Sequence, residues 1–457
     1  MLRFVNQHYA PDVASTGQHL TDLAEYLSAA GVPVEVVTGR AHYAGGTLNA
    51  PASELRAGVR VRRYRTPGLG RQSRAGRIFD YAMFYGQVAW ASWMGDAVDG
   101  TIYLTTPPLL GVIGWIGKAA RGRRYGIWSM DLHPDAEVAA GMLRRGSLLS
   151  RVLNWLNDRG YRNADFIVDL GPYMRKRILS KGVGAGRMAT VPVWGAAPEA
   201  SAGTVTTGES LHTRLGLEAA TVVMYAGNAG VVHEFGPILE AMRLMRDERD
   251  VHFVFAGGGP RRAAIEAYAR DHALRNFTYI DYVPREHLAG MLAAADVHLI
   301  SLRSAFAGIS VPGKLYGIMA AGRPALFVGP AACETADTIR SAGCGEIVDP
   351  AIGDAASRVT AAIRAWRANP EAARAAGARG LAAYTSRYQR GPNCAAFARV
   401  IEQAWPSMFT TFTRTAQDTG AMASVETQRT TTADVDAGES AKTSRDYPLA
   451  AAGVPSA

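Results

Sequence analysis

The stretch Val297–Pro324, VHLISLRSAFAGISVPGKLYGIMAAGRP, carries the pattern that decides the fold. Its first six residues form an apolar run that predicts a short buried strand. A loop with Gly308 and Pro312 follows, and then a helical segment that Gly322 and Pro324 end. Strands joined by helices in this way form mostly parallel sheets, because parallel strands need a crossover connection.

The same strand–helix pattern repeats along most of the chain. A small, polar and turn-rich seam at Gly195–Ala220 divides the repeats into two groups. The first helix, Gly17–Ala30, has apolar side chains on one face. We therefore predict two Rossmann-like α/β domains that face each other across a cleft. Strands are expected at Arg3–Asn6, Val34–Thr38, Val59–Tyr64, Thr101–Leu104, Tyr125–Met130, Phe166–Leu170, Thr221–Ala226, Val251–Ala256, Phe277–Ile280, Val297–Leu302, Ala325–Val328 and Glu346–Val348.

This division predicts four segments. Residues 1–195 form the first domain and residues 196–390 the second, and residues 391–406 form a terminal helix that crosses back to the first domain. Residues 407–457 are rich in Thr, Ser and Ala and show little apolar periodicity. Such a segment cannot bury enough surface to offset the entropy of ordering it, so we predict a disordered tail.

The charge of the chain is unevenly distributed. The net charge is +9, and residues 1–195 hold 24 Lys and Arg against 14 Asp and Glu. Eight arginines and no acid lie between Arg56 and Arg77. This cluster suits an anionic partner such as lipid headgroups or a diphosphate, and an ordinary solvated face is the alternative interpretation.

Two long uncharged stretches bear on membrane contact. Gly100–Gly117 holds two prolines and four glycines, so it fits a buried strand, a turn and a helix start better than a membrane span. Tyr81–Gly95 is apolar and aromatic, and we expect it in the core as well. The alternative is that Arg71–Trp93 forms a basic helix with an aromatic face on a membrane surface.

Cysteine usage and the first residues favour a cytoplasmic protein. Cys333, Cys344 and Cys394 show no metal-ligand spacing and no even disulfide framework, which fits a reducing compartment. The opening MLRFVNQHYAPD has no pattern typical of a signal peptide. We expect a cytoplasmic location, at the inner face of the membrane if the basic half binds lipid.

Ligands of parallel sheets bind beyond the carboxyl ends of the strands, and three clusters lie there. Two are glycine turns, Gly227–Gly230 (GNAG) and Gly257–Pro260 (GGGP), which let a ligand approach the backbone. The third holds Lys314 in the first turn of a predicted helix, where a cation opposes the helix dipole unless an anion lies nearby. A diphosphate supplies that anion; a solvated surface lysine is the alternative.

The run VPGKLYGIMAAGRP resembles the donor-site signature of retaining glycosyltransferase family 4, which has the GT-B fold, and in particular its bacterial cell-surface and exopolysaccharide group. NQHYAPDVASTGQHLTDLAEYL, WSMDLHPDAEVAAGML, VMYAGNAGVVHEF and FAGGGPRR resemble further blocks of the family in the same order. The resemblance spans about residues 1–400. It implies an acceptor-binding first domain, a nucleotide-sugar-binding second domain, transfer with retention, and no metal or other cofactor.

The resemblance also implies roles for individual residues. Asp131 and His133 are candidates for orienting the transferred sugar, and a capping Asp with a hydrogen-bonded His is the alternative. Lys314 meets the diphosphate, and Gly17 and His19 belong to the acceptor-side loop. Donor contacts are expected from Gly227, Asn228, Gly230, Gly257, Gly258, Gly259, Tyr282, Val283, Ser310, Pro312 and Lys314.

The sequence departs from the family pattern at three positions. Ala307 and Gly317 stand close to where the family carries two glutamates that contact sugar and ribose hydroxyls, and Val231 stands where a basic residue often follows the GNxG turn. Glu334, on the next strand–helix connection, is a candidate to replace one of these missing acceptors. The alternative interpretation is that Glu334 only stabilises the N-terminus of its own helix.

Four other functions remain to be weighed. A sugar-nucleotide 2-epimerase needs acid and base groups in the cleft, and a donor-binding protein without catalysis fits the missing glutamates. An NAD-dependent dehydrogenase needs a G-x-G-x-x-G turn after the first strand. This chain has QHYAPDVASTGQ there, so it fits that function poorly. Nucleic-acid binding rests on charge alone and is not expected. The expected partners are a nucleotide sugar, a lipid-linked or saccharide acceptor, and an anionic membrane surface.

Overall fold

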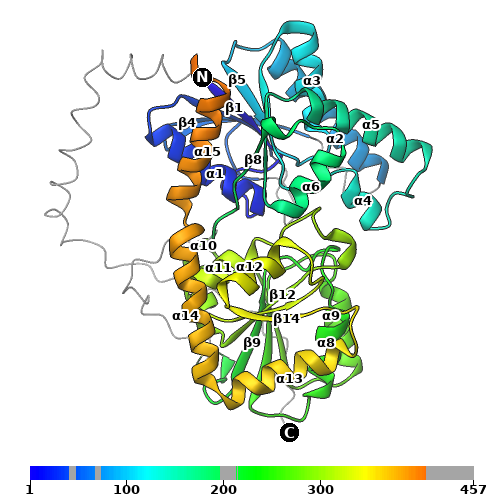
Figure 1. The fold of residues 1–457 in the computed structure, drawn as a ribbon, viewed down its shortest axis with the longest axis vertical. Coiled ribbons are helices and arrows are strands. Elements are labelled where there is room, and N and C mark those ends of the chain that lie inside the picture. The colour runs from blue at the N-terminus through cyan, green and yellow to red at the C-terminus, as the bar shows by residue number, and fades with distance from the viewer. Residues whose placement is uncertain (41–47, 67–73, 196–212, 214, 408–457) are drawn as a thin grey trace, which may run out of the picture. The chain divides into compact units, whose positions relative to one another are not determined.

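The computed structural model describes residues 1–40, 48–66, 74–195, 213 and 215–407. Within them the chain forms two α/β lobes, each built on its own sheet (Figure 1). We call β1–β8 with their helices the N-terminal lobe, and β9–β14 with theirs the C-terminal lobe. The expected fold class, two Rossmann-like domains, is confirmed.

The N-terminal lobe holds an eight-stranded sheet in the order β3-β4-β2-β1-β5-β6-β7-β8. Every neighbouring pair is parallel except β3 and β4. The central strands are short and buried on both faces, as expected when helices cover both sides of a parallel sheet. The strands are β1 (Leu2–Val5), β2 (Val34–Gly39), β3 (Ser53–Arg56), β4 (Val59–Tyr64), β5 (Gly100–Tyr103), β6 (Tyr125–Trp128), β7 (Phe166–Asp169) and β8 (Met188–Thr190).

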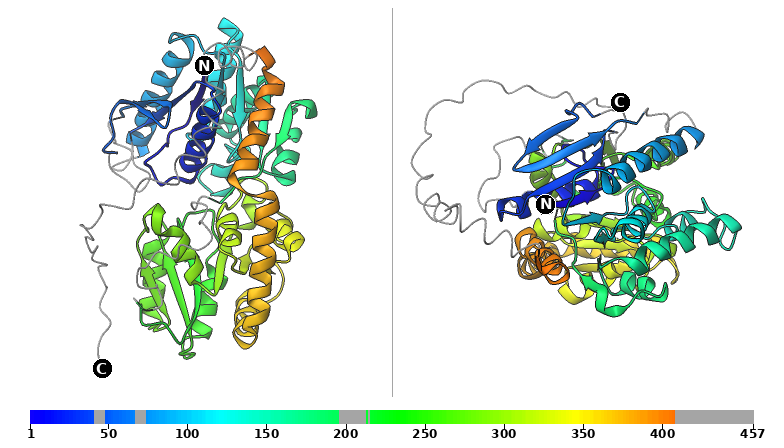
Figure 2. Two further views of the ribbon diagram at one scale, coloured as in Figure 1. Left: turned by 90° about the vertical axis from the view of Figure 1, so that its left-hand side faces the viewer. Right: turned by 90° about the horizontal axis from the view of Figure 1, so that it is seen from above.

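The helices of this lobe lie between the strands in sequence and cover both faces of the sheet (Figure 2). They are α1 (Ser15–Ala29), α2 (Arg74–Trp93), α3 (Leu110–Arg121), α4 (Asp135–Ala139), α5 (Leu148–Asn163) and α6 (Pro172–Ser180), with a short 3-10 turn, η2 (Ala185–Arg187).

The C-terminal lobe holds a six-stranded, wholly parallel sheet in the order β11-β10-β9-β12-β13-β14. The strand order reverses between β9 and β12, and ligands of such sheets bind in the crevice at that point. The strands are β9 (Thr221–Ala226), β10 (Val251–Ala256), β11 (Phe277–Ile280), β12 (Val297–Ser301), β13 (Ala325–Val328) and β14 (Gly345–Val348). The helices of this lobe are α8 (Gly236–Leu244), α9 (Arg262–Asp271), α10 (Arg285–Ala294), η3 (Ser304–Phe306), α11 (Lys314–Ala320), α12 (Glu334–Ala342), α13 (Ala355–Ala368) and α14 (Pro370–Arg387), and the chain then continues into α15 (Arg390–Ala404).

Each strand expected from the sequence is present, with its ends shifted by at most two residues. Two further strands were missed. Ser53–Arg56 is a polar, mostly exposed edge strand that pairs antiparallel with β4, so it lacks the apolar run of a central strand. Met188–Thr190 has only three residues. Residues 196–212, in the predicted seam, and residues 408–457, in the tail predicted to be disordered, lie outside the described residues.

The two uncharged stretches behave differently. Gly100–Gly117 forms the buried strand β5, a turn and the start of α3, as expected. The prediction that Tyr81–Gly95 is core is wrong for one face of α2: Phe84 and Val88 are buried, but Trp90 is 58% exposed. The reason is that α2 packs on the lobe through one stripe only. No helix in the described ranges is both long and apolar enough to cross a bilayer.

The arginine cluster is partly neutralised inside the lobe. Arg63 forms an ion pair with Glu54 at 2.6 Å and is buried, and Arg62 lies 3.3 Å from Glu35 on the neighbouring strand. Arg62 and Arg63 therefore hold strands together, whereas Arg56, Arg60 and Arg65 of the same cluster are exposed, and anion binding by the cluster stays a prediction.

The terminal helix α15 packs against the N-terminal lobe, whereas α14 packs against α11 of the C-terminal lobe (Figure 1, orange). Trp405, just after α15, is 1% exposed, and its indole nitrogen donates to an Asp165 carboxylate oxygen at 3.0 Å. Its ring meets Phe166 edge-on, 5.1 Å between centroids. A side chain at Gly100 would collide with the same ring, so β5 has a glycine where the tryptophan lies.

We expect Trp405→Ala to destabilise the protein by about 3–5 kcal/mol, because truncating a buried aromatic residue leaves a cavity. The measurement is the midpoint of thermal unfolding. Trp90→Ala removes the same atoms from an exposed site and serves as the control, with a change within about 0.5 kcal/mol. Equal midpoints for the two variants would contradict the anchoring role of Trp405.

Candidate functional site

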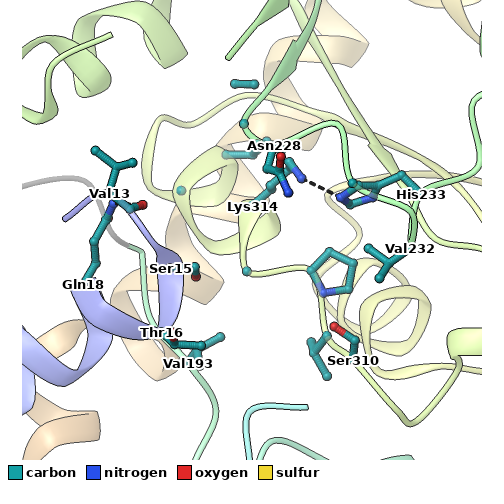
Figure 3. Close-up of a pocket in the computed structure, with 18 of the residues that line it drawn as sticks. Val13, Ser15, Thr16, Gln18, Val193, Asn228, Val232, His233, Ser310 and Lys314 are labelled. Carbon is teal, nitrogen blue, oxygen red and sulfur yellow. Dashed lines mark hydrogen bonds between the residues drawn. The ribbon is translucent and has the colours of Figure 1, made fainter. Parts of the chain in front are cut away.

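A pocket of about 640 Å³ lies at the carboxyl ends of β9 and β12, at the point where the strand order reverses. Figure 3 shows Val13, Ser15, Thr16 and Gln18 of the N-terminal lobe on one side of it, and Asn228, His233 and Lys314 of the C-terminal lobe on the other. Both lobes therefore contribute walls to the same pocket.

A glycine turn after β9 forms part of the pocket wall, and a second glycine turn, after β10, lies behind it. Gly227 has a φ of +122° and Gly257 a φ of +129°, in the region that favours glycine. A Cβ on Gly257 would lie 2.4 Å from the Gly227 carbonyl oxygen, so the two turns touch through their backbones. Gly227, Asn228 and Gly230 line the pocket, and Gly257, Gly258 and Gly259 support them from behind.

Lys314 begins α11 and lies directly over the first glycine turn. A Cβ on Gly227 would come within 2.8 Å of Lys314 Cε, so the missing side chain is what lets the lysine cross the turn. The ammonium lies 4.8 Å from the centroid of the Tyr225 ring, a cation–π distance. None of the carboxylates in the described residues forms an ion pair with it.

His233 is the hydrogen-bond partner of Lys314 (Figure 3, dashed line). Its Nδ1 lies 2.7 Å from the carbonyl oxygen of Ser301, which can only accept, so Nδ1 carries the proton. In the neutral ring Nε2 is then a free acceptor, 3.1 Å from Lys314 Nζ. The histidine thus directs an acceptor at the ammonium.

The electrostatics agree with this assignment. Lys314 keeps some exposure to the open pocket, but the protein that surrounds its ammonium removes water from it and lowers its pKa to about 7. Burial, together with the Lys314 charge, lowers the pKa of His233 to about 3. The histidine therefore stays neutral at physiological pH, whereas the lysine changes charge close to it.

Asp131 reaches the pocket from the N-terminal lobe. Its amide and that of Met130 donate to the Thr105 hydroxyl at 3.0 and 3.2 Å, and its backbone forms an isolated bridge with Ser310 of the C-terminal lobe. Asp131 is the one carboxylate among the described residues that line the pocket. A single carboxylate at the meeting point of the lobes can orient a hydroxylated ligand.

His133 lies outside the pocket lining and is engaged within its own turn. Its Nδ1 is 2.8 Å from Glu137 Oε1, one helical turn along α4. Burial alone would lower the pKa of His133, but the hydrogen bond and charge of Glu137 outweigh it and raise that pKa. Asp131 and Lys314 thus line the same pocket, and His133 lies outside that lining.

The remaining wall is largely apolar. Tyr282 and Val283 line it after β11, beside Leu288, Met291 and Leu292 of α10. The Tyr282 ring lies against Gly258, where a Cβ would be 2.9 Å away. Gly317 opens onto the same wall next to Leu292. A flat, apolar ring such as a nucleobase suits this end of the pocket.

The other residues proposed from the sequence lie as follows. Ser310 and Pro312 line the pocket beside Lys314, and His19 lines it from α1. Gly17 does not line it; the glycine lets α1 pass the backbone of His8. Glu334 is also absent from the lining, because its carboxylate accepts from the Met174 amide at 2.7 Å, at the start of α6. Its role as a donor contact stays a prediction.

Sequence reasoning missed His233, Thr16 and Gln18. His233 follows the GNAG turn by three residues in a loop, where a lone histidine carries no periodic signal. Thr16 and Gln18 belong to α1 and reach the site only because the lobes meet. Among the described residues no group of three His, Cys, Asp or Glu side chains is placed to hold a metal.

Comparison with known proteins agrees with this geometry. Residues 16–194 match the glycosyl transferase 4-like domain, and residues 220–366 match the glycosyl transferases group 1 domain. Together the two matches cover most of the chain; the first spans β2–β8 of the N-terminal sheet, and the second spans all six strands of the C-terminal sheet.

Among curated proteins, the putative colanic acid biosynthesis glycosyl transferase WcaI of Escherichia coli is 24% identical over 344 residues, 72% of this chain and 83% of WcaI. Among solved structures, the sucrose-phosphate synthase of Thermosynechococcus elongatus aligns with a TM-score of 0.67 at 18% identity, over 89% of this chain and 99% of that one. HepE of Anabaena in complex with UDP-glucose aligns with a TM-score of 0.64 at 12% identity, over 88% and 99% of the two chains.

The structural likenesses identify the fold, and the two domain matches and the curated relative identify the class of enzyme. The chain therefore belongs to the GT-B glycosyltransferases.

Proposed function

We propose that this enzyme transfers a sugar from a nucleoside diphosphate donor to an acceptor hydroxyl, with retention of the anomeric configuration and without a metal ion. The observation that carries the proposal is Lys314: a lysine ammonium surrounded by protein, with no carboxylate partner among the described residues, at the ligand-binding edge of a doubly wound sheet.

A diphosphate satisfies what this lysine lacks. An anion beside the ammonium restores its charged form, and the ammonium has three donors, so it can bind phosphate oxygen and His233 at once. The glycine turn Gly227–Gly230 lets the backbone approach the same group. The apolar wall at Tyr282 and Val283 takes the base, and the UDP-glucose bound to HepE is a ligand of this class.

In the proposed reaction the bond between the anomeric carbon and the leaving phosphate oxygen breaks, and negative charge builds on the diphosphate. Lys314 stabilises that charge in surroundings where protein has replaced part of the water around the ammonium. The acceptor hydroxyl attacks from the same face and passes its proton to the departing phosphate. Asp131 orients the transferred sugar from the opposite lobe.

The context of the reaction is assembly of a surface polysaccharide or glycolipid, with a lipid-linked or saccharide acceptor. The support is the relationship to WcaI, whose name places it in colanic acid biosynthesis. All three cysteines are buried and the structure joins none of them in a disulfide, which fits a reducing compartment, and we place the reaction in the cytoplasm.

The first test is a panel of nucleoside diphosphates and their sugars, measured by thermal shift. A ligand that binds only the folded state raises the unfolding temperature with concentration, and we expect one base to do so. In Lys314→Ala the shift should largely disappear, and kcat/KM in an EDTA-containing assay should fall by about 10²-fold or more if the charge is worth a few kcal/mol.

Lys176→Ala, at an exposed lysine of α6, is the matched control and should behave as wild type. A Lys314→Ala enzyme within about threefold of wild type would refute the role of Lys314. Donor binding without turnover in any acceptor assay would favour a donor-binding protein that has lost catalysis, in line with Ala307 and Gly317 in place of glutamates.

The lysine pKa predicts proton uptake on donor binding. Above about pH 7 the free enzyme holds Lys314 mostly neutral, whereas the diphosphate complex holds it as ammonium, so binding takes up a proton. Calorimetry in buffers of different ionisation enthalpy should find close to one proton at about pH 8 and almost none at about pH 6, with affinity falling as pH rises. Lys314→Arg stays protonated throughout and should show no uptake.

His233 should act by positioning this lysine. His233→Ala removes the acceptor, and we expect donor affinity to fall about tenfold, the size of a hydrogen bond to a charged group. Without that acceptor the ammonium is less stable, so the pH at which affinity declines should move lower. His252→Ala, at a histidine bonded to Thr278 outside the pocket, is the control. If the pH dependence of donor affinity is the same in His233→Ala as in wild type, His233 has only a packing role.

A further inference from the structure

We infer that the outer face of α2, α3 and α5 is a docking surface for an anionic lipid bilayer. This inference does not rest on the proposed function, because it concerns side chains outside the pocket. We call this surface the three-helix face.

Exposed apolar side chains are concentrated there. Of the eighteen large hydrophobic residues exposed in the described part of the chain, eleven lie between Ile78 and Trp155, nine of them on α2, α3 and α5, and Met94 and Met142 in the turns after α2 and before α5. They are Ile78, Phe79, Met83, Trp90, Met94, Ile116, Met142, Leu148, Leu149, Val152 and Trp155. Single exposed hydrophobic residues need no explanation, but a contiguous group marks an interaction surface.

On α5 these residues follow the helical period. Leu148, Val152 and Trp155 are spaced at i, i+4 and i+7, and Arg159 and Arg162 continue the same stripe. Arg159 lies over the Trp155 ring, 5.4 Å from its centroid. The stripe is apolar at the start of the helix and basic at its end, an arrangement typical of a helix that lies in a membrane interface.

The three helices are neighbours, so their exposed stripes form one surface. α3 packs against both α2 and α5. Trp115 of α3 meets Trp155 of α5 edge-on at 6.0 Å, and Arg121 at the end of α3 lies 3.0 Å from the sulfur of Met94, just after α2. The half-buried Trp115 thus joins α3 to α5, and Arg121 joins α3 to the turn after α2.

The charge on this surface selects the partner. From Leu110 to Asn163 seven arginines are exposed and none of the four acids is, and the nearest exposed acids before this range are Asp96 and Asp99, which follow α2. The arginines are Arg121, Arg124, Arg144, Arg145, Arg151, Arg159 and Arg162. Such a side chain can lay its apolar stem on the surface while its guanidinium reaches an anionic headgroup.

A second copy of the chain fits this face less well. A symmetric dimer places the same patch against itself, so arginines would meet arginines. A bilayer instead supplies an apolar interior for Leu148 and Leu149, an interface for the indoles of Trp90 and Trp155, and negative charge for the arginines.

The test compares two double variants of the full chain with matched exposure. Leu148→Ser with Leu149→Ser removes side chains that are 79% and 58% exposed on the three-helix face, and Leu55→Ser with Ile352→Ser removes side chains that are 75% and 60% exposed elsewhere. Each protein is floated with phosphatidylcholine vesicles, with and without phosphatidylglycerol. Equal unfolding midpoints establish that both variants fold.

We expect wild type to bind the phosphatidylglycerol vesicles at least about tenfold more tightly than the neutral ones, and to lose that preference in about 0.5 M NaCl. The Leu148 and Leu149 variant should bind about tenfold more weakly than wild type, and the control variant should be unchanged.

Two results would overturn the inference. One is failure of wild type to float with anionic vesicles at low salt. The other is a Leu148 and Leu149 variant that binds vesicles as tightly as wild type does. Light scattering is then used to ask whether wild type is an oligomer that this variant dissociates. If the variant does dissociate such an oligomer, the three-helix face is the contact surface for a second copy of the chain. Neither result bears on donor binding, which the nucleotide panel measures separately.

Discussion

The charge of Lys314 is the feature on which the site depends. Protein around Lys314 removes water from its ammonium and lowers its pKa to about 7, so without a ligand the pocket stabilises the charged form of the lysine only in part. His233 offers a single acceptor, fixed by its bond to the Ser301 carbonyl, and the Tyr225 ring lies nearby. The pocket is consequently built to be completed by an anion.

The backbone around this lysine is shaped to leave room for it. Gly227 lets the side chain cross the turn after β9, and Gly257 lets the next turn touch the first. These close approaches need two glycines at the ends of adjacent strands. The parallel sheet brings those strand ends together, so the local glycine pattern and the global topology act on the same point.

Contacts between the lobes complete the pocket. The Leu132 amide donates to the Ile309 carbonyl at 3.0 Å, beside the bridge that joins Asp131 to Ser310. Glu334 accepts from the Met174 amide and so joins the start of α12 to the start of α6. These polar contacts hold Asp131 in the same pocket lining as Lys314.

The sequence by itself determined the fold class, the two sheets and the C-terminal half of the site. Apolar runs, helix ends and glycine turns are local signals, and the nearly regular order of a doubly wound sheet places Gly227, Ser310 and Lys314 at one edge. Only the tertiary structure decided which side chains face one another. It showed His233 on Lys314, Glu334 on α6 and the exposed stripe of α2, because such pairings depend on residues far apart in the chain. Periodicity shows that a helix has an apolar face, but the neighbours that cover that face, or leave it exposed, are set by packing.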